Sequence, residues 1–195
     1  MPMGGLGYVR TLAALRAAGP NRATFSTAIT ALNEQARVAM DPADWYEGRV
    51  LRLTFAGAIS NVVTGPTSFT FEFRLGPTST IAAFSTGALV CSTTAHTTVP
   101  IWGEILMTAQ VLGAGTTAKL MGQGIVTSRA IVDVSGADVT TIGHPTLLGP
   151  ETTPAQGTGF DSTIQNMADF FVACSNSQAT NAFQLQQYTL EDLGV

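Results

Sequence analysis

The chain has 195 residues, of which 45% are hydrophobic and only 11% are charged, and its formal net charge is −4. This charge argues against a nucleic-acid partner, because phosphate binding needs clustered Lys and Arg side chains, and no segment has the uninterrupted nonpolar length of a transmembrane helix. Soluble domains usually carry about a quarter charged residues. We therefore expect much of this surface to contact other protein, in a homo-oligomer or a larger assembly.

Residues 1–35 are predicted to form an N-terminal arm. The segment Tyr8–Ala18 is rich in Ala, Leu and Arg and ends at a Gly-Pro stop signal, so we expect either a short helix or an extended arm. Arg10 and Arg16 interrupt its nonpolar run, which argues against a signal peptide. Residues 21–33 fit a strand or a helix equally well. The candidate interface residues of the arm are Leu6, Val9, Leu12 and Leu15.

Residues 36–195 are predicted to form one β-sandwich domain. Nonpolar and polar residues alternate over residues 51–59 and again over residues 69–75, as they do in half-buried strands. Residues 81–90 predict two weaker strands. Large aromatic side chains on one parity of a strand predict an aromatic layer in the core. These side chains are Phe69, Phe71 and Phe73.

A two-stranded ribbon is predicted at the centre of this domain. The segment Val99–Val111 alternates in polarity, and a glycine-rich break over residues 113–117 separates it from a return strand over Ala118–Thr127. Gly122 and Gly124 interrupt the return strand, as bulges or close backbone approaches do. The pattern therefore predicts a hairpin in which the second strand lies unusually close to its neighbours.

The C-terminal third begins with a predicted long loop. Residues 130–159 are crowded with Gly and Pro, and predicted strands follow over residues 169–175 and 183–190. In the last strand the nonpolar residues change parity, which predicts a bulge near Gln186-Gln187 unless both faces are covered. In total, about eight short strands separated by turn residues predict an all-β fold, an antiparallel jelly-roll-like β-sandwich.

The sequence contains no motif of a known catalytic or cofactor site. It lacks the G-x-S-x-G nucleophile elbow, and although Gly113–Ala118 matches the dinucleotide pattern G-x-G-x-x-A, a strand is predicted after it where that motif needs a helix. His96 and His144 have no metal-ligating neighbour at a useful spacing and are predicted to lie in surface loops. We therefore expect no enzyme, no cofactor and no metal. Three aspartates that lack the spacing of a calcium loop are Asp133, Asp138 and Asp161.

Two cysteines and three aromatic residues leave alternatives open. A disulfide between Cys91 and Cys174 is permitted but not implied, and free buried thiols are the favoured interpretation. Trp45, Tyr46 and Trp102 could together form a platform for sugar stacking, but aromatic residues beside nonpolar strands are more often core or interface anchors. Trp102 is accordingly included among the candidate interface residues.

Several segments carry a resemblance to a known family. The run Trp45–Leu53, with the sequence WYEGRVLRL, and the following Gly57–Ser60 resemble the start of a jelly-roll module found in structural proteins of tailed bacteriophages. The similarity spans residues 36–193, and residues 1–35 depart from it. The other similar segments are 120–124, 157–163 and 187–193.

The resemblance implies a virion component without enzymatic activity. The favoured interpretation is a capsid decoration or cement protein on the capsid exterior, a homotrimer whose partners are copies of itself and the major capsid protein. The alternative is a head-fibre or tail-associated protein that binds a receptor or a carbohydrate through residues 133–159 and Trp102. A glycan hydrolase is the weakest alternative, since no catalytic carboxylate pair can be identified from the sequence.

Overall fold

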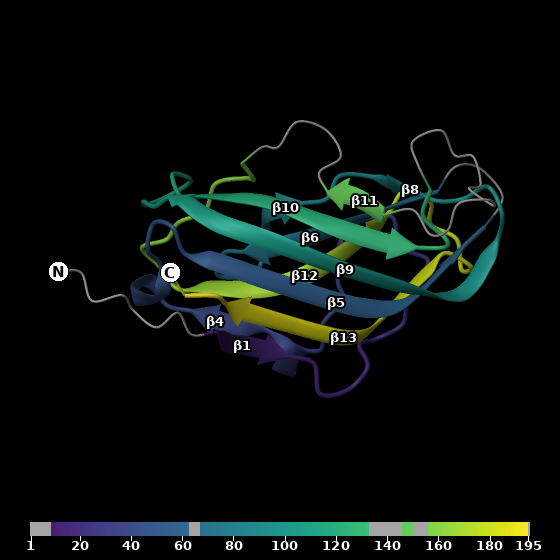
Figure 1. Cartoon of the computed structure of the whole chain (residues 1–195), viewed down its shortest axis with the longest axis horizontal. Helices are drawn as coiled ribbons and strands as arrows, with labels where there is room; N and C mark the ends of the chain where they lie inside the picture. Colours follow the sequence, from purple (N-terminus) through teal and green to yellow (C-terminus); the bar gives the residue numbers. More distant parts are fainter. Residues whose placement is uncertain (1–8, 63–66, 133–145, 150–155, 195) are drawn as a thin grey trace.

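The computed structural model describes residues 9–62, 67–132, 146–149 and 156–194. In this part of the chain two antiparallel β-sheets pack face to face, with short 3-10 turns η1 (Glu34–Ala36) and η2 (Pro42–Asp44) as the only helical elements (Figure 1). This arrangement confirms the predicted all-β antiparallel sandwich. The thirteen strands found exceed the expected eight, because several two- to five-residue strands have no polarity pattern that the sequence could reveal.

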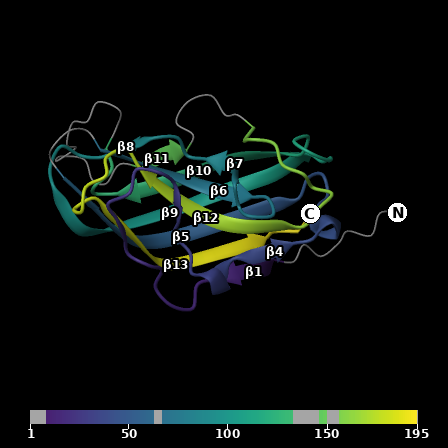
Figure 2. The same cartoon turned by 180° about the vertical axis from the view of Figure 1, so that it is seen from behind.

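The larger sheet has the strand order β1-β13-β5-β9-β10-β11, and β2 also pairs with β13. The smaller sheet has the order β3-β12-β6-β7, with β4 paired to β12 and β8 paired to β6 (Figure 2). The strands of the larger sheet are β1 (Arg10–Ala14), β2 (Arg22–Ala23), β5 (Val50–Asn61), β9 (His96–Val111), β10 (Lys119–Ser128), β11 (Thr146–Gly149) and β13 (Ala182–Asp192). The strands of the smaller sheet are β3 (Ile29–Thr30), β4 (Val38–Met40), β6 (Ser68–Leu75), β7 (Ile81–Ser85), β8 (Leu89–Val90) and β12 (Asn166–Cys174).

The N-terminal segment is extended, which selects the arm over the helix. Strand β1 pairs with β13, with Arg10 opposite Asp192, and the Leu15 amide donates to the Tyr188 carbonyl oxygen at 2.9 Å. Without β1, one edge of β13 would have unpaired backbone groups, and pairing with that edge outweighs the high helix propensity of Ala and Leu. Residues 21–33, which fitted either structure, contain the short strands β2 and β3. The division of the chain at residue 36 stays a prediction.

The core between the sheets is aromatic, as predicted for β6. Phe71 of β6 lies 5.0 Å from Phe55 of β5 and 5.3 Å from Phe183 of β13, measured between ring centroids. Phe170 of β12 contacts Phe55 at 4.9 Å and Tyr188 at 6.0 Å. These rings come from both sheets, so their contacts hold the two layers together, and burial of each ring contributes on the order of a few kcal/mol.

The central hairpin is confirmed in register and in its close approaches. Strands β9 and β10 pair from Lys119 opposite Val111 to Ser128 opposite Ile101. A Cβ added at Gly122 would collide with the ring of Phe84, and one added at Gly124 would lie 2.6 Å from the Glu104 carbonyl oxygen. The two glycines therefore let a neighbouring ring and a neighbouring backbone come closer than any side chain would permit.

The predicted bulge in β13 is present. Its pairing with β5 shifts register between Leu185 and Gln187, so Phe183 and Leu185 before the shift and Tyr188 after it all face the core. The insertion leaves Gln186 and Gln187 both exposed to solvent. Both are therefore available on the outside of the larger sheet.

The prediction of a long loop over residues 130–159 is partly wrong. Residues 146–149 form β11, which pairs with β10 and extends the larger sheet, with Leu148 opposite Ile125. Strand β11 is short and follows a Gly/Pro-rich stretch, so its pairing depends on the free edge of β10 and leaves little signal in its own sequence. Residues 133–145 and 150–155 lie outside the described residues.

A buried ion pair joins the start of β5 to the end of β13. The Arg49 side chain, 2% exposed, donates from Nε at 3.1 Å and from Nη2 at 2.9 Å to the Asp192 carboxylate. Its Nη1 donates to the Asp44 carbonyl oxygen at 2.7 Å, and the guanidinium lies 5.4 Å from the Trp45 ring centroid. The η2 turn and the C-terminal strand are thereby held by one side chain.

Candidate functional site

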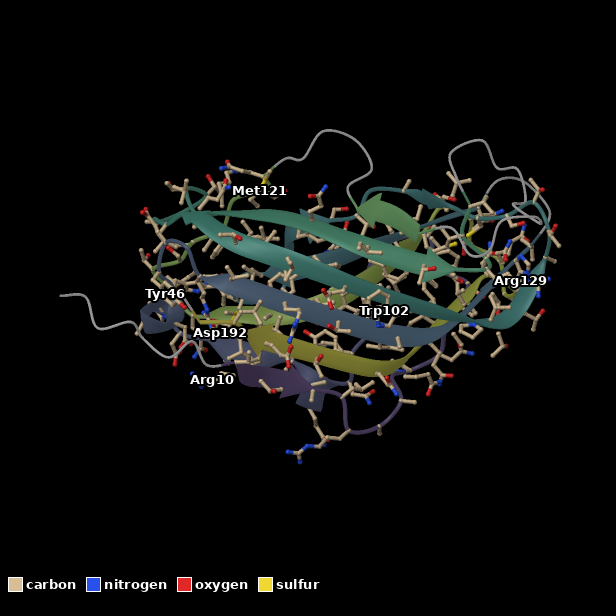
Figure 3. All side chains as sticks on the ribbon, in the orientation of Figure 1. Arg10, Tyr46, Trp102, Met121, Arg129 and Asp192 are labelled. Atoms are coloured by element: carbon tan, nitrogen blue, oxygen red, sulfur yellow. The ribbon has the colours of Figure 1, made fainter. Side chains whose placement is uncertain are left out.

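The outer face of the larger sheet exposes several large nonpolar side chains to solvent. Polarity alternates along β9, so Ile101, Ile105 and Met107 face the core, while Trp102 and Leu106 face solvent with 41% and 44% of their surface exposed. Figure 3 views this face, with Trp102 near its middle. A nonpolar residue on both parities of one strand is typical of a strand that is covered on both sides.

Strand register divides this face into two areas. Leu106 lies opposite Gln123, and Glu104 lies opposite Ile125, which is 39% exposed. Together with the half-buried Met121 these residues line a hollow of about 410 Å³. We call Leu106, Met121 and Ile125 the Leu106 patch.

The second area is a groove of about 580 Å³ beside Trp102. Trp102 pairs with Ala56 of β5, and Ala56 pairs with Gln187 of β13, so one row across three strands consists of an indole, a methyl group and an amide. Next to Ala56, Gly57 has no room for a Cβ because the Gln184 carbonyl oxygen occupies that space. We call this feature the Trp102 groove.

Polar side chains border the Trp102 groove. Gln186 and Gln187 form the side opposite Trp102, and Arg129 and Thr127 also line the groove. The Gln186 Nε2 donates to the Gln184 Oε1 at 3.0 Å. The sequence revealed the bulge that presents both glutamines, but the groove depends on the register of three strands and was missed. The change of parity in β13 was the available signal.

The other described candidate interface residues lie in or next to β1, at the edge of the larger sheet that is farther from β10 and β11. Val9 is 56% exposed, whereas Leu12 and Leu15 are partly buried against the core of their own chain, and Leu6 lies outside the described residues. Only Val9 therefore offers a large free nonpolar surface among the described residues of this group. The role of all four in an interface stays a prediction.

The structure does not combine the three aromatic residues into one platform. Trp45 is a core residue, 7% exposed and 4.8 Å from the Phe160 ring centroid. Tyr46 is exposed but lies at one end of the molecule, away from Trp102 (Figure 3). A stacking surface, if used, therefore depends on Trp102 alone.

The histidine and cysteine predictions have different outcomes. His96 is buried, 7% exposed, as the first residue of β9, so its placement in a surface loop was wrong, because the strand begins three residues earlier than its alternation predicts. His144 lies outside the described residues. Cys91 and Cys174 are free and buried, as predicted, and burial raises the pKa of the Cys91 thiol to about 12. A thiol with this pKa stays protonated and unreactive near neutral pH.

Asp161 has a structural role at the hairpin loop. Its carboxylate accepts hydrogen bonds from the Thr163 hydroxyl at 2.6 Å, the Thr163 amide at 2.8 Å and the Gly115 amide at 2.8 Å. These donors lower the pKa of Asp161, the Thr163 hydroxyl most of all. The described residues contain no group of three His, Cys, Asp or Glu side chains that could hold a metal ion. Asp133 and Asp138 lie outside the described residues. The strand that was predicted to follow the glycine-rich loop at residues 113–117 is present as β10.

The lowered pKa of Asp161 makes the hairpin loop sensitive to acid. Because the folded state favours the carboxylate, its stabilising contribution is present above the ordinary value of 3.8 and is lost as the pH falls through the lowered pKa. In an NMR titration the Gly115 amide proton should shift with a midpoint below 3.8. Asp161→Asn should abolish this titration, and a midpoint at or above the ordinary value would contradict the assignment.

Among the described residues, no helix is both long and nonpolar enough to cross a membrane.

Comparisons with known proteins assign no family, since no family model and no curated protein match the chain. One similar solved structure is the CBM2 module of Lactobacillus casei BL23 phage J-1 evolved Dit, with 12% identity, a TM-score of 0.29, and coverage of 82% of this chain and 69% of that chain. A TM-score this low supports no conclusion about a shared fold or function.

Proposed function

We propose that this chain is a structural protein of a tailed-bacteriophage virion, a capsid decoration protein that associates with copies of itself and with the major capsid protein. The observation that carries the proposal is the Leu106 patch, where large nonpolar side chains are exposed at the middle of an open sheet. Only 11% of the residues are charged, so burial against other subunits replaces the solvation that charged residues usually provide. The resemblance over residues 36–193 also supports a virion component.

A decoration protein acts by mass action. Because it binds the assembled shell and not the free subunits, it shifts the assembly equilibrium toward the shell. Such a role needs an extended surface and no reacting groups. Two ion pairs on the outer sheet faces fit this role, since Arg52 pairs with Glu191 at 2.7 Å and Arg74 with Glu72 at 2.6 Å.

Self-association through the Leu106 patch can be tested by light scattering coupled to size-exclusion chromatography. The wild-type protein is expected to elute as a trimer, and Leu106→Arg or Ile125→Arg to elute as a monomer at the same concentration, because a buried unpaired charge opposes association. Thr180→Arg, an exposed loop position between β12 and β13, adds the same charge elsewhere and should leave the trimer intact. A wild-type monomer at all concentrations would contradict the proposal.

The location on the virion is tested separately. Gold-labelled antibodies raised against this chain should mark the heads of virus particles that carry it. Label confined to the tails would replace the decoration function by the tail-associated alternative. That alternative is favoured by a different observation, the Trp102 groove.

A further inference from the structure

We infer that the Trp102 groove is a carbohydrate-binding site in which one pyranose ring stacks on the Trp102 indole and its hydroxyl groups bond to the amides of Gln186 and Gln187. This inference goes beyond the proposed association of the chain with capsid proteins and does not depend on it. It identifies a ligand class for a surface that lies beside the Leu106 patch, four residues away along β9.

The first step is the exposure of the indole. Trp102 is 41% exposed although its strand lies between β5 and β10, so no element of the described chain covers it. An indole is a wide nonpolar surface with one N–H donor, and a pyranose presents a nonpolar C–H face and polar edges. A binding site of this kind combines a nonpolar surface with a few polar groups that fix orientation.

The second step is the width of the groove. Trp102 and Gln187 face each other across one intervening strand, with Ala56 between them. Two interstrand spacings place their backbones about 10 Å apart. In this row of strands the small Ala56 methyl is the side chain between the two walls, so the groove of about 580 Å³ has room for a single ring lying along the sheet.

The third step is the chemistry of the opposite wall. An amide side chain carries two donors and an acceptor, and so matches hydroxyl groups that both donate and accept. Gln186 and Gln187 are adjacent and both exposed because of the bulge, and the hydrogen bond from Gln186 to Gln184 restricts the first of them. Among the described residues that line the groove there is no carboxylate, and Arg129 is the one charged side chain, so acidic as well as neutral sugars fit its electrostatics.

The experiment uses an array of four probes. Three are neutral tetrasaccharides, one each of glucose, galactose and N-acetylglucosamine, and the fourth is oligogalacturonate as the acidic probe. The wild-type protein should bind at least one of them, and the affinity for that probe is then measured by calorimetry. Trp102→Ala should weaken binding tenfold or more, and Gln187→Ala by several-fold. Leu106→Ala, which removes an equally exposed side chain of the same strand outside the groove, should leave the affinity unchanged.

Loss of binding in Arg129→Ala for oligogalacturonate alone would identify the acidic sugar as the preferred ligand. The inference is overturned if none of the four probes binds at millimolar concentration, or if Trp102→Ala binds as tightly as the wild type. It is also overturned if Trp102→Ala dissociates the oligomer while no sugar binds, since the groove would then be a protein interface. Leu106→Arg separates the two proposals, because it should abolish the trimer and retain the sugar.

Discussion

Replacing Asp192 with Ala is expected to lower the free energy of unfolding by about 3–5 kcal/mol, because it leaves the buried Arg49 guanidinium without its carboxylate. Within the described part of the chain, the Arg49 side chain would keep the hydrogen bond to the Asp44 carbonyl oxygen and the contact with the Trp45 ring. Urea denaturation followed by circular dichroism measures this loss. The strand end and the η2 turn should loosen together, since both are held by Arg49.

The neighbouring residue supplies a matched control. Glu191 pairs with Arg52, but their side chains are 20% and 35% exposed, and solvent-exposed pairs of this kind contribute about 0–1 kcal/mol. Glu191→Ala should therefore have a small effect. Replacing both Arg49 and Asp192 with nonpolar residues of similar size should cost less than Asp192→Ala alone. Equal losses in Asp192→Ala and Glu191→Ala would contradict the buried pair.

The second large effect is expected for Phe170→Ala, with a loss of about 3–5 kcal/mol of unfolding free energy. Phe170 is fully buried and lies between the two sheets, with ring centroids of Phe55 and Tyr188 at 4.9 and 6.0 Å. Truncation removes this contact area and leaves a cavity that a sheet sandwich cannot collapse easily. Thermal and urea unfolding of the variant and the wild type measure the difference.

Phe171 is the control for this prediction. It follows Phe170 in β12 but faces outward, where its ring lies under the Arg74 guanidinium at 4.3 Å. Phe171→Ala removes a partly exposed ring and one cation–π contact, and its cost should be about 1 kcal/mol. A loss for Phe171→Ala as large as that for Phe170→Ala would show that the inward-facing ring is not the one that joins the sheets.

The elements that could be predicted from sequence are those with strict alternation. Strand β6 buries every second side chain throughout, as β5 does over residues 50–56 and β9 over residues 101–109, and the parity change in β13 correctly marked a bulge. The N-terminal strand and β11 could not be predicted from their own residues, because each is held by the otherwise unpaired edge of another strand, β13 and β10 respectively.

The candidate site shows the same limit. Trp102 was singled out because it is an aromatic residue beside a nonpolar strand, a criterion that says nothing about its neighbours on other strands. The groove arises from Trp102, Ala56 and Gln187 lying in one row, and these residues are brought together by two strand pairings whose register no local pattern specifies. Residues that are ordinary one by one thus form a distinctive surface only after the sheet is assembled.

The position of β13 in the larger sheet has a consequence for biosynthesis. This strand lies between β1 and β5, so the N-terminal strand has no partner until residues 182–192 have left the ribosome. Such distant pairings are slow to form, and in the meantime the edge of β5 is bare and able to recruit strands from other nascent chains. High-level expression should therefore favour inclusion bodies, and slower translation or a lower temperature should raise the yield of native protein.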